Sequence, residues 1–135
     1  MIYDVKQIEG IGEAYGERLA KLDVHTTDDL LKTGATKSGR QHLAEKADIP
    51  ESLILTWVNH ADLMRINGVA GQFSELLEAA GVDTVKELSH RNPENLHIKM
   101  LEVNNKFGLS GKVPSVETLT DMIEQAKKME QKVFH

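Results

Sequence analysis

The sequence predicts an all-α protein in which one helical unit is used twice, and three observations lead to this prediction. Residues 8–31 recur 58 positions later as residues 66–89. Apolar residues recur at helical spacing, and no segment has the sustained period-two alternation of a half-buried strand. Aromatic residues make up only 4% of the chain, so the core must be mainly aliphatic, which suits helix-on-helix packing. We expect about nine helices in total.

The two copies, IEGIGEAYGERLAKLDVHTTDDLL and INGVAGQFSELLEAAGVDTVKELS, agree at the positions that decide local structure. The identical pairs include Ile8 and Ile66, Gly10 and Gly68, Glu17 and Glu75, Leu19 and Leu77, Val24 and Val82, Thr26 and Thr84, and Leu30 and Leu88. Three replacements keep the chemistry of the position, namely Phe73 for Tyr15, Ser74 for Gly16 and Gly81 for Asp23. A repeat that preserves a turn, a small residue, a helix stop and a cap together is not a chance similarity.

Each copy carries the signals of a turn, a helix and the start of a second helix. Gly10 and Gly12 flank one aliphatic residue, so the backbone there can adopt positive φ and another chain can approach closely. Asp23 tolerates the left-handed conformation that ends a helix. The predicted capping boxes of the second helices are Thr26 with Asp29 and Thr84 with Glu87.

These residues resemble the signature of the helix-hairpin-helix proteins, which is an aliphatic residue, a spacer, Gly, an aliphatic residue, Gly, a small residue four places later and further aliphatics. The first copy fills it with Ile8, Gly10, Ile11, Gly12, Gly16, Leu19 and Leu22. In the second copy Ala70 replaces the second glycine, and Gly71 follows one place late. The chain most resembles an uncharacterised bacterial family of tandem helix-hairpin-helix domains of unknown function. The resemblance implies two SAM-like helical bundles packed together, residues 1–65 and 66–135, or one compact domain made from both.

The rest of the first half supplies a lead-in and two more helices. Residues 2–7 form a short helix or an extended segment before the first turn. Thr36 caps a helix that runs to about Ala47, and Pro50 lies in the first turn of the next helix. The apolar stripe of that helix is Leu53, Ile54, Trp57, Val58, Ala61 and Met64. This helix leads directly into the second glycine turn.

The second half continues in the same order. Asn92 caps a helix whose first residue is Pro93. Its expected buried stripe is Leu96, Met100, Val103 and Phe107. After a linker, Ser115 begins the last helix, and we expect the chain to fray over residues 133–135.

Composition and charge limit the kinds of function that are open to the chain. Its 135 residues have a net charge of −5, which weighs against a strong and nonspecific grip on nucleic acid. Residues 8–31 carry six acids against two bases, and residues 66–89 carry four acids against one base. The absence of cysteine removes disulfides and thiolate chemistry and fits a reducing compartment. With no signal peptide and no membrane-spanning apolar run, we expect a cytoplasmic protein without a membrane partner.

The first glycine turn is the sharpest candidate for a binding site. Backbone N–H groups at such a turn and at the following helix N-terminus can bind a phosphate oxygen without reading a base. Against this, Glu13 would lie at the mouth of the site and repel a phosphate. A turn that only joins two helices is the alternative. The residues predicted to contact nucleic acid are Gly10, Ile11, Gly12, Arg18, Lys21, Lys37, Arg40, Gly68 and Gly71.

No pattern in the chain indicates an enzyme, a metal site or a cofactor. Its six histidines lack a shared helical face, and we interpret His60 with Asp62 as an ordinary surface pair. None of the serines has the sequence context of a nucleophile elbow. We therefore expect a non-enzymatic binding module that touches the DNA or RNA backbone weakly. The alternative is a protein-interaction scaffold whose acidic hairpins have lost DNA binding and meet a partner protein or a second copy.

Overall fold

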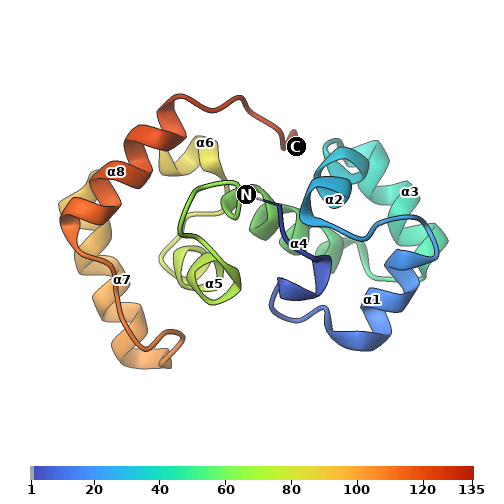
Figure 1. Cartoon of the computed structure of the whole chain (residues 1–135), viewed down its shortest axis with the longest axis horizontal. Coiled ribbons are helices and arrows are strands. Elements are labelled where there is room, and N and C mark those ends of the chain that lie inside the picture. The colour runs from blue at the N-terminus through green and yellow to red at the C-terminus, as the bar shows by residue number, and fades with distance from the viewer. Residues whose placement is uncertain (1) are drawn as a thin grey trace.

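The computed structural model describes residues 2–135, and it is all-helical, as the sequence predicts (Figure 1). One 3-10 helix, η1 (Val5–Gln7), precedes the α-helices. These are α1 (Gly12–Ala20), α2 (Thr27–Gly34), α3 (Lys37–Ala47), α4 (Glu51–Leu63), α5 (Gly71–Ala79), α6 (Val85–Leu88), α7 (Pro93–Phe107) and α8 (Val116–Lys127). Within the described residues there is no strand, only an isolated bridge between Asp4 and Thr26. None of these helices combines the length and the apolar character that crossing a membrane requires.

Helix α4 lies in the middle of the molecule, with α1–α3 on one side and α5–α8 on the other (Figure 1). It packs against α2, α3 and α5. Every residue from 57 to 64 is buried, because this stretch is covered from both sides. The buried apolar side chains of both halves form one continuous cluster around it.

The two copies of the repeat adopt matching backbone conformations at the first glycine of the turn and at the helix stop, but they differ two residues after that glycine, where Gly12 has a φ of 60° and Ala70 one of −110°. Gly10 and Gly68 have φ of 93° and 90°. After each helix, the amide of Val24 donates to the Leu19 carbonyl at 3.0 Å, as the Val82 amide does to Leu77 at 2.9 Å. The residues that stop the two helices, Asp23 and Gly81, both have positive φ.

The predicted caps differ in only one detail from those in the structure. Thr26 and Asp29 form the full capping box at the start of α2. Thr84 accepts from the Glu87 amide in the same way, but the Glu87 carboxylate accepts from Arg91 Nη2 at 2.7 Å and does not complete a box. The other predicted cap residues, Thr36, Asn92 and Ser115, each accept a hydrogen bond from the first turn of α3, α7 and α8.

Two predictions about the second half are wrong. Phe107, assigned to the buried stripe of α7, is 59% exposed, because α7 ends there and the chain turns away at Gly108. Residues 130–135, which were expected to fray in part, instead run back over α6 towards α2 (Figure 1). Val133 is buried, and the Phe134 amide donates to the Ala35 carbonyl at 2.8 Å. We refer to residues 130–135 as the strap.

Candidate nucleic-acid interface

The first glycine turn is an open corner of the molecule. Gly10 and Gly12 are both exposed and have φ of 93° and 60°, while Ile11 between them is buried in the core. Within 4 Å of the place that a Cβ would take on Gly12 there is no other atom. Helix α1 begins here without a side-chain cap, so the amides of its first turn face outward without an internal acceptor side chain.

Carboxylates surround this corner. Glu9 and Glu13 are exposed beside the turn, and Glu13 forms an ion pair with Lys6 at 3.2 Å. Because both of its side chains are exposed, this pair contributes little to stability and leaves the corner close to neutral or negative. The geometry of the turn suits an anion, whereas the side chains around it do not.

The second glycine turn is partly closed by contacts with the rest of the protein, since Gly68 is exposed whereas Gly71 is buried. A Cβ on Gly71 would lie 2.3 Å from the Gln7 carbonyl oxygen and 3.5 Å from a Glu9 carboxylate oxygen. Next to it, the Asn67 amide donates to Gln125 Oε1 of α8 at 2.9 Å. Gly71 is therefore buried and does not offer the surface contact predicted for it. In the second copy, position 70 does not need a glycine, because Ala70 has a φ of −110° that any residue can adopt. The glycine one place later, Gly71, instead allows the close approach of the Gln7 carbonyl.

The predicted basic residues do not converge on the first turn. Arg18 donates to the Asp48 carbonyl at 2.9 Å and lies over the Tyr15 ring. Lys21 is exposed at the end of α1, about 13 Å along the helix axis from the turn. Lys37 is exposed at the start of α3. Arg40 was expected to be a surface cation, but it is only 3% exposed and cannot reach a phosphate at the first turn.

The structure also reveals a buried polar cluster around His60, a residue that the sequence analysis interprets as part of a surface pair. His60 is 3% exposed, and its Nε2 lies 3.0 Å from a Glu78 carboxylate oxygen. Its Nδ1 lies 3.4 Å from the hydroxyl of Ser74, which is fully buried and donates to the Gly71 carbonyl. The cluster thus links α4 to α5. One signal could have found it, since His60 lies three residues after Trp57 and four before Met64, on the apolar stripe.

No group of three or more potential ligand side chains in residues 2–135 is arranged to hold a metal ion. The Ser74, His60 and Glu78 side chains lie in contact in that order, but the serine hydroxyl is closed off from solvent. Their arrangement suits the packing of α4 on α5.

Next to this cluster, burial raises the pKa of the Glu75 carboxyl above its ordinary value of 4.5, Glu9 raises it further, and His60 opposes the change. A raised pKa means that the folded state holds the proton more tightly, so stability falls as the pH rises through the folded pKa. Glu75→Gln is therefore expected to stabilise the protein at pH 7 and to have no effect below about pH 3, where both states are protonated. Urea unfolding at several pH values measures this. The exposed Glu102→Gln serves as the control, and equal effects of both changes would contradict the prediction.

Comparison with known proteins places the chain in a family. The model of the family described as "Domain of unknown function (DUF4332)" matches residues 9–129, which include both copies of the repeat except Ile8. No curated protein and no solved structure matches the chain. Because the matched region covers nearly the whole sequence, the chain belongs to the DUF4332 family of domains of unknown function.

Proposed function

We propose that the protein is a non-enzymatic binding module made of two tandem helix-hairpin-helix units, residues 1–65 and 66–135. In this proposal its first glycine turn binds the nucleic-acid backbone weakly and without reading bases. The matched turns, helix stops and hydrogen bonds of the two copies support the tandem arrangement. Nucleic-acid binding rests on one observation, the exposed turn at Gly10–Gly12 that leads into an uncapped helix N-terminus.

The acidic surroundings set the expected strength of this contact. Outward-facing amides of α1 can donate to a phosphate oxygen, but Glu9 and Glu13 repel it and few lysines are close by. Because only one or two phosphates would be contacted, we expect the affinity for nucleic acid to decrease only slightly as the salt concentration rises. Such a module works beside a stronger DNA- or RNA-binding partner, or as an oligomer that presents several turns.

Gly12→Val is the sharpest test of this proposal. The new side chain would block a phosphate oxygen from the turn, so we expect binding to single-stranded and duplex DNA at about 50 mM salt to weaken about tenfold. Fluorescence anisotropy titrations measure the change.

Gly108→Val is the matched control for this variant. Gly108 has a φ of 62°, close to the 60° of Gly12, and it too has no atom within 4 Å of the place that a Cβ would take, so both variants carry similar backbone strain. Only Gly12→Val should lose DNA affinity. Equal losses in both variants, or no DNA binding by the unaltered protein at about 50 mM salt, would rule the proposal out.

The second candidate is a protein-interaction scaffold, and the burial of one glycine of the second turn favours it. There, Gly71 packs on the Gln7 carbonyl, so only Gly68 of the two predicted glycines is exposed. If DNA does not bind, an acidic corner around Glu9 and Glu13 remains as a surface for a basic protein. A basic peptide that binds at low salt, and loses affinity in a Glu9→Gln, Glu13→Gln variant, would support this alternative.

A further inference from the structure

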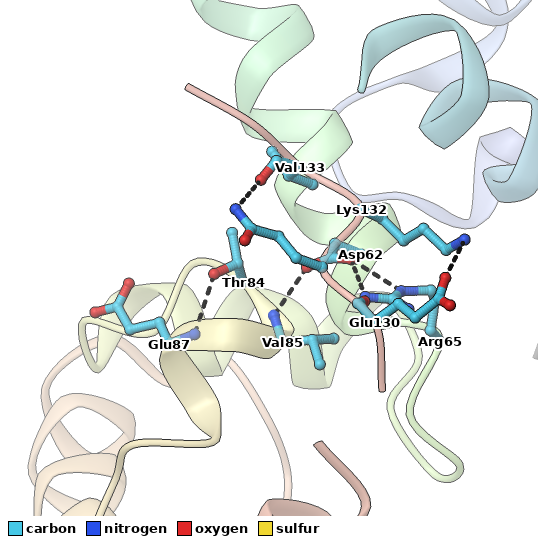
Figure 2. Close-up of polar contacts among 9 residues, drawn as sticks. Asp62, Arg65, Thr84, Val85, Glu87, Glu130, Lys132 and Val133 are labelled. Atoms are coloured by element: carbon cyan, nitrogen blue, oxygen red, sulfur yellow. Dashed lines mark hydrogen bonds and ion pairs between the residues drawn. The ribbon is translucent and has the colours of Figure 1, made fainter. Parts of the chain in front are cut away.

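The strap runs as an extended segment past α4 and α6 (Figure 2). Cavities on its sides are lined by residues of both halves of the protein, and together they form the groove that the strap occupies. A cavity of about 360 Å³ is lined by Glu130 and Lys132, and another of about 320 Å³ by Gln131, Val133 and His135. A third cavity of about 330 Å³ is lined by Gln131, Lys132 and Phe134, so the strap has open space along most of its length. Because cavities lie on both sides of the strap, close packing contributes little to holding it. The strap is held mainly by its hydrogen bonds and by the buried side chain of Val133.

Three cations from three different elements donate to the strap. Arg65, just after α4, donates to the Glu130 carbonyl at 3.0 Å. Lys86 of α6 donates to the Gln131 side-chain oxygen at 3.2 Å. Arg40 of α3 donates to the Phe134 carbonyl at 2.8 Å. All three acceptors are neutral oxygens.

Arg40 is the clearest sign that this groove accepts a negative occupant. Carboxylates also line the cavities, namely Asp28, Asp62 and Glu87, but each is already paired with a cation of the protein. The Arg40 side chain is only 3% exposed, and its other hydrogen bonds go to the Gly34 and Ala35 carbonyls. Burial lowers its pKa, and the charge of Glu51 opposes the change. A buried cation is better satisfied by a carboxylate than by carbonyl groups alone. Among the described residues, neither Arg40 nor Lys86 forms an ion pair, whereas Arg65 is paired with Asp62.

We propose that this groove is a docking site for an extended acidic peptide of a partner protein, and that the strap occupies it as an internal stand-in. The extended strap shows that the groove accepts a polypeptide backbone. In such a peptide, a carboxylate in place of the Gln131 side chain would give Lys86 an anionic acceptor. A carboxylate on the residue that follows the position of Phe134 would do the same for Arg40. The site is separate from the glycine turn and does not depend on the function proposed above.

Binding of labelled peptides to the full chain tests this proposal. The acidic probe has the sequence of residues 128–135 with Lys128→Gln, Gln131→Glu and His135→Glu, and the neutral probe has Lys128→Gln alone, which leaves Glu130 balanced by Lys132. Fluorescence anisotropy should show the acidic probe binding at least about tenfold more tightly. A labelled single-stranded oligonucleotide is the third probe, and it should not compete with the acidic peptide.

Two variants of the full chain give opposite expected changes. Lys86→Met should weaken the acidic probe about fivefold, whereas Lys99→Met, on the exposed face of α7, should leave it unchanged. Val133→Ser removes the buried anchor of the strap, so the internal competitor leaves more readily and the acidic probe should bind up to about tenfold more tightly.

General structural damage would not produce a gain in affinity, so the Val133→Ser result separates docking from a merely structural strap. The proposal is overturned if the acidic probe binds no better than the neutral probe. It is also overturned if Val133→Ser fails to tighten binding, or if the oligonucleotide displaces the acidic peptide from the groove.

Discussion

Asp62→Ala is expected to lower the free energy of unfolding by about 4 kcal/mol. Asp62 is 2% exposed, and one of its oxygens accepts from the Val85 amide at 2.8 Å while the other accepts from Arg65 Nε at 2.9 Å (Figure 2). Without the carboxylate, a buried amide of α6 loses its acceptor and the guanidinium of Arg65 loses its ion-pair partner. Urea unfolding measures the change.

Two further substitutions make this test specific. Asp62→Asn keeps the shape and one acceptor oxygen, so it should cost less, about 2 kcal/mol, and keeps the test usable if the alanine variant does not fold. Asp28→Ala removes a half-exposed carboxylate paired with Lys32 and should cost less than about 0.5 kcal/mol. A loss in Asp62→Asn no larger than that in Asp28→Ala would contradict the role given to Asp62.

Gly71→Ala is expected to destabilise the protein by about 2 kcal/mol. The added Cβ would lie 2.3 Å from the Gln7 carbonyl oxygen, and this backbone atom cannot move aside as a flexible side chain can. In an isolated helix the same change would stabilise by up to about 1 kcal/mol. A loss of stability in Gly71→Ala would therefore support the close contact between η1 and α5, whereas a gain in stability would contradict it.

Gly111→Ala provides the comparison for this prediction. No atom lies within 4 Å of the place of its Cβ, so its stability should stay within about 0.5 kcal/mol of the unaltered protein. Thermal and urea unfolding of both variants measure the difference. If Gly71→Ala were as stable as Gly111→Ala, the second turn would be open at Gly71, and the reason for excluding this residue from nucleic-acid binding would be lost.

The local features of the candidate site could be predicted from the sequence. The glycine pattern indicated positive φ at Gly10, and the threonine and asparagine caps lie at the starts of α2, α3, α6 and α7. Each depends on residues within about four positions of one another. Which of the predicted basic side chains are exposed could not be predicted in this way. Arg40 and Lys37 lie three residues apart on α3, yet Arg40 is buried and Lys37 is exposed.

By itself, the sequence determined that the chain is all-helical, where most of its helices begin and end, and that one turn-and-helix unit occurs twice. Only the tertiary structure decided which copy keeps an open turn and what becomes of Arg40. The Gln7 carbonyl partly closes the second turn from more than 60 positions away, and Arg40 meets Phe134 across 94 positions of sequence. Helical spacing and caps depend on neighbours along the chain, whereas such contacts depend on how the whole core packs, which no local pattern encodes.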